Sequence, residues 1–306
     1  MPLKLKVKVG PPHVSGPLAL YPIWSLLPPA LPYLPGPLAP AESVSISELE
    51  EGAQVDTLSV QNAALSPVLL LEGELVSGAQ QDRTLNVSVL LDAGTKVTLP
   101  VSCVEAGRWG GGSHFTRTHR MASPSLRWSK TDGVNDSVKA HGGRASDQGQ
   151  VWESVDSYVD RYAAAAPPPT SAFTDVEAAV RQTADSLVGD RRPEPGQTGV
   201  AAAIGGRLVA IDLFDRPETL EAYWDTVVAA YAVDAVDSID IEGDQSTPVS
   251  AESITELLAR IEALPVDEIE GVGLGQGIHL GDGELRASGL VWEDALVHLG
   301  VLVGAD

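Results

Sequence analysis

Four side chains with the chemistry of catalytic groups occur as two pairs, each with one residue between its members. Glu72 and Glu74 flank a glycine, and Cys103 and Glu105 flank a valine. Alternate residues of a strand point to one face, so each pair is predicted to act together. Carboxylates in a dry pocket serve as general acid and base, and a thiol becomes a nucleophile where its pKa is lowered. All four are catalytic candidates, although simple core packing is an alternative for the thiol.

Side chains suited to a phosphorylated substrate surround the two pairs. Arginine offers a fork of N–H donors that matches phosphate oxygens, amide groups add hydrogen bonds, and an indole ring stacks on a base. The substrate-binding candidates are Gln81, Arg83, Asn86, Arg108, Trp109, Arg127 and Gln148. No ligand spacing typical of a metal site occurs, and the cofactor is unknown. Mg²⁺ held by carboxylates on a pyrophosphate substrate is the metal-dependent variant that stays open.

A basic, glycine-rich segment follows at residues 106–146. It contains seven Lys and Arg residues against two Asp residues, in a chain whose formal net charge is −22. Arginines together with closely approaching backbone amides are typical of a phosphate site. The segment is predicted to be a long irregular loop, and residues 110–150 are predicted to cover a site built from residues 72–83 and 103–109. The alternative is a flexible surface loop without a function.

The elements that must position these residues indicate an α+β protein, with a β-rich antiparallel first half and a mixed α/β, acidic second half. Strands are predicted at 55–60, 68–71, 84–91 and 96–104, and a hairpin at 199–214. Helices are predicted at 43–52, 151–166, 174–188, 216–233 and 251–264. The chain is divided into residues 1–150, which carry the candidate site, and residues 151–306, packed together as one unit.

Charge and composition exclude several classes of protein. Residues 151–306 carry 8 Lys and Arg against 29 Asp and Glu, an acidic surface suited to solubility or to docking a basic protein partner. Such a chain is not expected to bind DNA or RNA generally. The uncharged stretch 10–41 contains ten prolines, so it predicts neither a membrane helix nor a signal peptide. A cytoplasmic location without membrane association is therefore expected.

Two motifs resemble a known family. The runs Leu-Glu-Gly-Glu-Leu-Val-x-Gly-Ala-x-Gln-x-Arg at 71–83 and Pro-Val-Ser-Cys-Val-Glu-x-Gly-Arg-Trp at 100–109 are similar to the ADP-ribosylglycohydrolase- and rhodanese-phosphatase-associated domain family. Shorter matches at 146–152, at 212–214 and near His298 extend the resemblance over nearly the whole chain. The family name records neighbours that handle ADP-ribose. The resemblance therefore implies a link to NAD- and ADP-ribose-derived metabolism, and no particular reaction.

Three functions are compatible with these observations. The first is an enzyme that hydrolyses or transfers at a bond of an ADP-ribose- or NAD-derived nucleotide with the help of a carboxylate. The second is a non-catalytic module that binds an ADP-ribose-type ligand. The third is a scaffold that docks a partner through its acidic half, with Glu72, Arg83 and Glu105 in a structural ion network. Under the first two, Glu74→Gln or Glu105→Gln is expected to abolish activity or binding without unfolding the protein.

Overall fold

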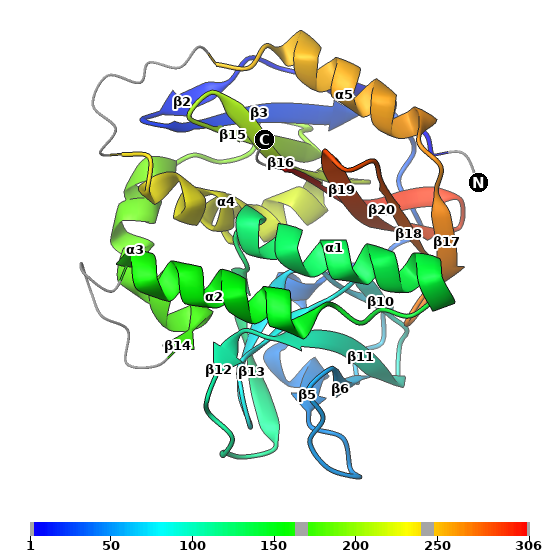
Figure 1. Ribbon diagram of the computed structural model, residues 1–306. Helices are drawn as coiled ribbons and strands as arrows, with labels where there is room; N and C mark the ends of the chain where they lie inside the picture. The colour runs from blue at the N-terminus through cyan, green and yellow to red at the C-terminus, as the bar shows by residue number, and fades with distance from the viewer. Residues whose placement is uncertain (1–2, 163–170, 240–247, 305–306) are drawn as a thin grey trace.

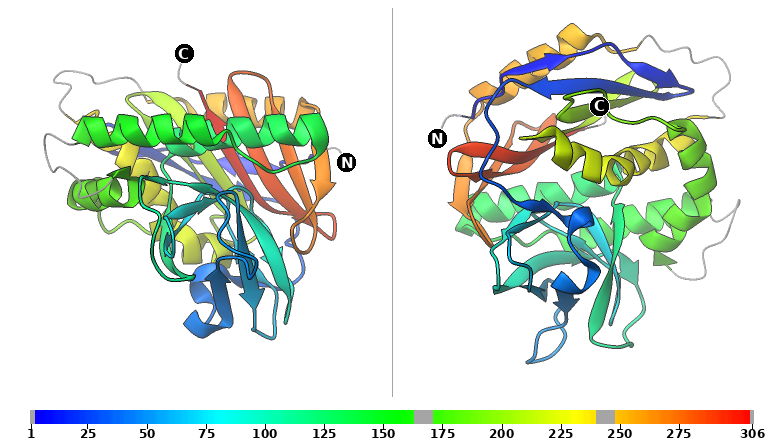
Figure 2. Two further views of the ribbon diagram at one scale, coloured as in Figure 1. Left: turned by 60° about the horizontal axis from the view of Figure 1, so that its bottom comes forward. Right: turned by 180° about the vertical axis from the view of Figure 1, so that it is seen from behind.

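The computed structural model describes residues 3–162, 171–239 and 248–304, and the predicted α+β class is confirmed (Figure 1). A large antiparallel sheet and a small closed β-barrel lie on opposite sides of two helices, α1 (Pro124–His141) and α4 (Pro217–Val236). Figure 2 shows the same arrangement from behind, with α4 between the sheet and the barrel. The helix predicted at 216–233 is confirmed as α4.

Neighbouring strands of the large sheet are antiparallel, in the order β1-β3-β15-β16-β20-β19-β18-β17, with β2 paired to β3. The predicted hairpin at 199–214 is confirmed as β15 and β16. Because β3 pairs with β15, the sheet joins strands from both predicted halves of the chain. The strands are β1 (Val7–Val9), β2 (His13–Ser15), β3 (Leu18–Ser25), β15 (Gly199–Ile204), β16 (Arg207–Phe214), β17 (Asp267–Glu270), β18 (Gln276–Gly281), β19 (Leu285–Trp292) and β20 (Ala295–Val303).

The barrel closes in the order β11-β6-β5-β13-β8-β9 around an apolar interior that includes Leu58, Val60, Leu99 and Val101. Its strands are β5 (Val44–Ser47), β6 (Thr57–Asn62), β8 (Glu74–Gly78), β9 (Arg83–Leu85), β11 (Lys96–Cys103) and β13 (His114–Met121). The helix predicted at 43–52 is wrong. Its first residues form β5, where buried and exposed side chains alternate with the period of two that a strand requires.

Smaller elements connect the barrel to the rest of the chain. A three-stranded sheet has the order β10-β7-β4, and β12 pairs with β14. These strands are β4 (Leu34–Pro35), β7 (Val68–Leu70), β10 (Val89–Leu91), β12 (Glu105–Ala106) and β14 (Ser171–Ala172), and short 3₁₀ turns occupy η1 (Gly36–Leu38) and η2 (Ala41–Ser43). The strand predicted at 84–91 is therefore interrupted, because its two ends belong to different sheets as β9 and β10.

The remaining helices are α2 (Gln148–Tyr162), α3 (Phe173–Val188) and α5 (Ala251–Ala263). They confirm the helices predicted at 174–188 and 251–264, and the one predicted at 151–166 as far as residue 162; its last residues lie outside the described part. The apolar side of α5 consists of Ile254, Leu258 and Ile261 and packs on the face of the large sheet away from the barrel (Figure 1). That face therefore takes no part in positioning the candidate residues.

The irregular loop predicted at 106–146 is wrong over most of its length, because β13 and α1 occupy it. Ser123 accepts a hydrogen bond from the backbone N–H of Leu126 and begins α1, as an N-cap residue does. The buried side of α1 includes Arg127 and Lys130 alongside apolar residues. Because these charged residues stand at positions that face the core, the sequence lacks the regular spacing of apolar residues by which a helix is predicted. The side chains of Arg127 and Lys130 are thus core components, not parts of a flexible cover.

Candidate functional site

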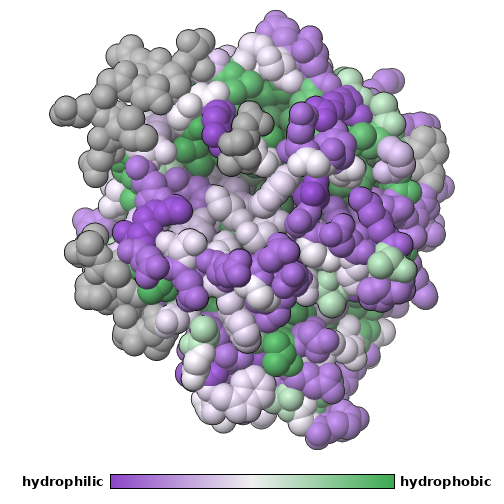
Figure 3. All heavy atoms as spheres, viewed as in Figure 1, coloured by the Kyte–Doolittle hydropathy of each residue, from purple (hydrophilic) through white to green (hydrophobic). Residues whose placement is uncertain are grey.

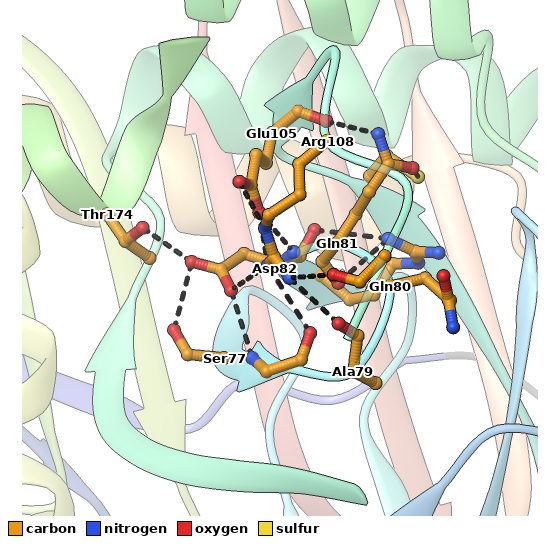
Figure 4. A network of polar contacts seen from close by, with 12 residues as sticks. Ser77, Ala79, Gln80, Gln81, Asp82, Glu105, Arg108 and Thr174 are labelled. Carbon is orange, nitrogen blue, oxygen red and sulfur yellow. Dashed lines mark hydrogen bonds and ion pairs between the residues drawn. The ribbon is translucent and has the colours of Figure 1, made fainter. Parts of the chain in front are cut away.

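The candidate residues fall into two polar clusters at different places in the fold. We call the first the interlock, which lies where the barrel, α1 and the large sheet meet. It consists of Glu72, Arg127, Lys130, Asp212 and His298. We call the second the barrel-end cluster, shown in Figure 4. It consists of Gln81, Asp82, Arg83, Cys103, Glu105 and Arg108.

The interlock is centred on Arg127 of α1, which donates to two carboxylates at once. Its Nε and Nη2 lie 3.0 and 2.8 Å from Glu72 Oε2, and its Nη1 and Nη2 lie 2.9 and 3.0 Å from the two oxygens of Asp212. Lys130 Nζ lies 2.5 Å from Glu72 Oε1. These four side chains are buried. Two cations and two anions therefore balance, and fork-shaped hydrogen bonds stabilise the buried charges.

Asp212 links the interlock to the large sheet. His298 Nε2 lies 3.1 Å from its Oδ1, His298 Nδ1 lies 2.9 Å from Ser88 Oγ, and Tyr231 donates its hydroxyl hydrogen to Oδ2. Burial alone would raise the pKa of Asp212, but Arg127 and the hydrogen bond from His298 outweigh burial and hold the pKa well below its usual range. The Asp212 carboxylate is therefore ionised at neutral pH and fully engaged.

Two glycines make room for the arginine of the interlock. A Cβ atom at position 300 would lie 2.7 Å from Arg127 Nη2, and one at position 73 would lie 3.0 Å from Arg127 Cδ. Gly73 also has φ of 86°, a conformation that disfavours other residues. The local sequence therefore fits the guanidinium closely, and both glycines are required by this packing.

The prediction that Glu72 and Glu74 share a face is wrong. The positive φ of Gly73 turns the chain just before β8, so the two carboxylates point to different surroundings. Glu74 Oε1 accepts hydrogen bonds from the backbone N–H of Leu71 at 2.6 Å and from the hydroxyl of Tyr223 at 2.8 Å. Arg117 lies 3.5 Å from its other oxygen. Glu74 therefore contacts the residue that follows β7, α4 and β13, and the hydrogen bonds and ion pair that the described structure gives it join it to neither cluster.

The barrel-end cluster begins with a bidentate ion pair between neighbours in sequence. Arg108 Nε and Nη2 lie 2.6 and 2.5 Å from the two oxygens of Glu105. Arg108 also donates to the backbone carbonyl of Ala79 at 2.8 Å, and Glu105 accepts from the backbone N–H of Asp82 at 2.9 Å. The hydrogen bond to Glu105 raises the pKa of Arg108. The pair therefore ties the segment 78–82 to the end of β12.

Asp82 is a member of this cluster that the sequence did not single out as a site residue. Its Oδ2 accepts from the hydroxyls of Thr174 at 2.6 Å and Ser77 at 3.0 Å, and its Oδ1 accepts from the backbone N–H of Gly78 at 3.1 Å (Figure 4). Arg108 Nη2 lies 3.3 Å from the same oxygen. Its position inside the 71–83 motif is the feature of the sequence that could have identified Asp82 as a site residue. Its contact with Thr174, 92 residues away, follows from no local pattern.

Cys103 is the last residue of β11, and both its backbone and its thiol form hydrogen bonds. Gln148 accepts from its backbone N–H and donates to its carbonyl, each at 2.9 Å, and its Sγ lies 3.2 Å from Gln81 Oε1. Burial, opposed by Arg83 and reinforced by nearby carboxylates, raises the pKa of the thiol to about 11. The thiol is therefore protonated at neutral pH, the form that is a poor nucleophile.

Arg83 and Cys103 are the most deeply buried members of the cluster, and the position of Arg83 in the barrel explains its burial. Its position alternates with Leu85 of β9, whose side chain belongs to the barrel interior, so the guanidinium points inward as well. The residue is fully buried, and its Nη1 donates to the carbonyl of Gln81 at 2.9 Å. Its Nε and Nη2 have no hydrogen-bond partner among the described residues. No carboxylate of the described part lies within ion-pair distance of Arg83.

The segment shortly before Arg83 contains two residues with positive φ. Gly78 has φ of 125°, and Ala79 has φ of 42°, which is uncommon for a residue with a Cβ atom. Strained residues persist where the surrounding contacts hold them, and they concentrate at ligand sites. Hydrogen bonds from Arg108 to the Ala79 carbonyl and from the Gly78 backbone N–H to Asp82 hold this segment in place.

Two candidates lie at the margins of the clusters. Asn86 accepts from Ser102 at 2.6 Å and donates to the Arg144 carbonyl at 2.9 Å, so it joins the barrel wall to the segment before α2. Trp109 follows Arg108 directly and is 56 % exposed, so its indole ring is open to solvent beside the barrel-end cluster. Of the substrate-binding candidates, Arg127 is thus placed in the interlock, and Gln81, Arg83, Arg108 and Gln148 meet at the barrel end.

Comparison with protein families matches residues 6–302 to the ARG and Rhodanese-Phosphatase-superfamily-associated Protein domain, ARPP-1. The chain belongs to this family. The resemblance read from the two motifs is thereby confirmed over nearly the whole sequence. No curated protein and no solved structure matches the chain, so no relative supplies an activity for this ARPP-1 domain.

Three further observations describe the surface and interior of this ARPP-1 domain. Over the described ranges, no group of three His, Cys, Asp or Glu side chains is arranged to hold a metal ion. The helices found in the part of the chain that the structure describes are too short or too polar to span a membrane. Hydrophilic residues dominate the face over α1 and α2, as Figure 3 shows.

Proposed function

We propose that the protein binds an ADP-ribose-type nucleotide at the barrel-end cluster, with a phosphate group of the ligand on Arg83. The observation that carries the proposal is the fully buried guanidinium whose Nε and Nη2 have no partner in the described structure. A buried cation without a counter-ion is costly, and two adjacent free N–H donors match two oxygens of a phosphate. The membership of the chain in a family named for ADP-ribosylglycohydrolase neighbours supports the choice of ligand.

The remaining groups of the cluster have separate tasks in this proposal. Arg108 is already paired with Glu105, so it positions the segment 78–82 and releases it when a ligand enters. Trp109 is exposed next to Arg108, where its ring can stack on the base of the nucleotide. The amide of Gln81 lies next to Cys103 and offers a hydrogen bond to a ribose hydroxyl.

The reaction that these groups support is carboxylate-assisted hydrolysis or transfer at a glycosidic or phosphate-ester bond. Glu48 Oε2 is buried without a hydrogen-bond partner in the described structure, and Glu48 and Arg83 both act electrostatically on the Cys103 thiol. A carboxylate with one free oxygen beside a bound phosphate ester is suited to general acid–base catalysis. The thiol is left out of this role because its raised pKa keeps it protonated. A binding module without turnover is the second candidate, since Glu72, Glu74 and Glu105 are all engaged by donors.

The test is a thermal-shift measurement of purified protein with ADP-ribose, NAD and AMP, followed by mass spectrometry of each mixture. A ligand at one hundred times its Kd adds about 2.7 kcal/mol to the free energy of unfolding, which raises Tm measurably. The decisive variant is Arg83→Met, and Arg192→Met is its control, because Arg192 is an exposed arginine far from the barrel. We expect the shift with ADP-ribose in the wild type and in Arg192→Met, and its loss in Arg83→Met.

Each outcome separates the candidate functions. A shift together with a new product mass supports the enzyme and identifies the bond that is broken. A shift without product supports the binding module. The absence of a shift with all three nucleotides overturns the proposal and favours a scaffold that docks a basic partner through acidic residues of the second half. A shift that survives in Arg83→Met shows that the ligand binds elsewhere.

A cytoplasmic location belongs to the same proposal, because NAD-derived nucleotides are made and consumed there. Cell fractionation followed by detection of the intact chain tests it. Recovery of the protein outside the cytoplasm would remove this part of the proposal without affecting the binding measurement.

A further inference from the structure

A cavity of the described structure lies away from both polar clusters. It has a volume of about 640 Å³ and opens where β3 and β16 end and where β19 turns into β20. This volume is in the range of sites for small organic molecules. Neither the interlock nor the barrel-end cluster contributes to its lining. The cavity is therefore independent of the proposed nucleotide site.

The walls of this cavity are largely apolar. Leu3 and Leu5 line one side, Leu27 and Pro28 another, and Leu296 of β20 a third. Most of these residues pack against the apolar cluster on the outer face of the large sheet. The adjoining Leu26 is 65 % exposed, so apolar surface continues outward from the opening. Apolar lining of this extent favours a ligand with a hydrocarbon or aromatic body.

The lining of the cavity includes four charged side chains, of which one is buried and three are exposed. Asp215 is buried and already engaged, since it accepts from Arg216 at 2.8 Å and from the backbone N–H of Ala30 at 2.9 Å. Glu293, Asp294 and Lys4 are exposed and form no hydrogen bond or ion pair with other described residues. Two free carboxylates against one ammonium group leave the opening with an excess of negative charge. A cationic group is the complement to that excess.

The turn that carries the two carboxylates has a backbone that its residues do not favour. Glu293 and Asp294 have φ of 49° and 62°, and they connect β19 to β20 as a two-residue hairpin loop. Positive φ at both central positions defines the turn for which Asn-Gly is strongly preferred. Glutamate is therefore disfavoured at the first of these positions, whereas aspartate is tolerated at the second.

We propose that this cavity binds a small organic cation with an apolar body. The body occupies the space between the N-terminal segment and the end of β3, and the positive group lies against the β19–β20 turn. Glu293 and Asp294 supply the electrostatic preference, and the leucines and prolines supply the apolar contact.

The experiment compares two probes of the same shape and opposite charge, tetraphenylphosphonium and tetraphenylborate, by isothermal titration calorimetry on the full chain. Three variants accompany the wild type. Glu293→Asn with Asp294→Gly removes both charges and installs the favoured turn, so this variant is expected to keep or raise Tm. Leu27→Trp fills the cavity from a loop. Asp156→Asn with Asp160→Asn removes two exposed charges from α2 and controls for general attraction to an acidic protein.

The expected result is tetraphenylphosphonium binding at least about tenfold tighter than tetraphenylborate to the wild type and to the α2 control. The turn variant should lose most of that preference, and Leu27→Trp should weaken tetraphenylphosphonium binding about tenfold or more. Equal or tighter binding of tetraphenylborate overturns the proposal. So does the absence of tetraphenylphosphonium binding, or binding that neither the turn variant nor Leu27→Trp alters.

Discussion

The interlock and the barrel-end cluster are built from the same parts, arginines set against carboxylates, but they differ in how completely those parts are paired. In the interlock, Arg127 makes four hydrogen bonds of 2.8 to 3.0 Å to Glu72 and Asp212. At the barrel end, Arg108 is paired as fully with Glu105, whereas Arg83 keeps two nitrogens without a partner in the described structure. Complete pairing is typical of a structural role, and spare donors on a buried cation are typical of a ligand site.

The two clusters also differ in what they join. The interlock takes its residues from the segment before β8, from α1, from β16 and from β20, so it joins the barrel to the large sheet. The barrel-end cluster takes all of its residues from the short stretches 81–83 and 103–108 at one end of the barrel. Because the interlock joins residues of the barrel and of the large sheet, it determines how these two layers dock. The barrel-end cluster lies at one end of the barrel, where Arg108 is partly exposed to solvent.

The largest effect on stability is expected from Arg127→Met. The substitution leaves Glu72 and Asp212 buried with an uncompensated negative charge, which destabilises by about 3–5 kcal/mol. That is a large fraction of the roughly 5–15 kcal/mol by which proteins are stable. Urea denaturation followed by circular dichroism measures the loss. Arg127→Lys keeps the positive charge but loses the two-pronged hydrogen bonds of the guanidinium, so its free energy of unfolding should lie between those of the wild type and Arg127→Met. If Arg127→Met were as stable as the wild type, the interlock would not be what docks the barrel on the large sheet.

The second largest effect is expected from a drop in pH, which should lower the free energy of unfolding through a buried histidine next to α1. His279 of β18 contacts Asn135 of α1 at 2.8 Å, and burial, together with Arg144 and Lys130, lowers its pKa to about 4. A histidine of the unfolded chain takes up a proton below about pH 6.5, whereas His279 in the folded protein stays neutral down to about pH 4. The free energy of unfolding is therefore unaffected above pH 6.5 and falls by about 3 kcal/mol as the pH drops to 4.

Urea denaturation at intervals between pH 7.5 and 4 checks this expectation, with His279→Gln as the control variant. The variant has no titrating imidazole at this position, so its stability should decline less over the same interval. Parallel curves for the two proteins would show that other groups cause the acid sensitivity.

The sequence predicts those elements of the two regions whose stabilising contacts lie close together in the chain, and it does not predict those that depend on distant residues. The hairpin at 199–214 and the helices α4 and α5 follow from apolar period and turn residues, which are local signals. α1 was missed because Arg127 and Lys130 occupy inward positions, where the period requires apolar residues. The helix is stabilised by partners in other elements, which a local pattern does not contain.

The candidate site shows the same limit. The motifs at 71–83 and 100–109 brought Gln81, Arg83, Cys103, Glu105 and Arg108 into one prediction, and the structure places them together because β9 pairs with β11. The pairing of Glu72 with Glu74 failed because Gly73 has a positive φ that no spacing reveals. Asp212 and His298 lie more than 130 residues from Glu72, so the contacts of Asp212 with Arg127 and with His298 depend on the tertiary fold.

A smaller effect on stability is expected from Glu105→Gln at the barrel end. The amide keeps an acceptor for the Asp82 N–H but loses the charge that pairs with Arg108, whose side chain is 34 % exposed. Solvent screens the pair, so we expect a loss of about 1–2 kcal/mol and weaker thermal stabilisation by ADP-ribose. Glu177→Gln is the matched control, because Glu177 also pairs with partly exposed arginines and is not a member of the barrel-end cluster. Equal loss of the ADP-ribose response in both variants would remove Glu105 from the proposed site.

The smallest effect on stability is expected from Arg83→Met, although this residue is as deeply buried as Arg127. Its guanidinium has two unpaired nitrogens and no carboxylate within ion-pair distance in the described structure, so methionine removes an uncompensated charge and fills similar space. We expect the free energy of unfolding to change by less than about 1 kcal/mol, or to rise, in the same urea experiment that destabilises Arg127→Met. A loss as large as that of Arg127→Met would show that Arg83 is paired in solution and would end the distinction between the two clusters. A stable Arg83→Met protein that no longer responds to ADP-ribose would instead separate binding from folding at a single side chain, which is the behaviour expected of a ligand site and not of an interlock.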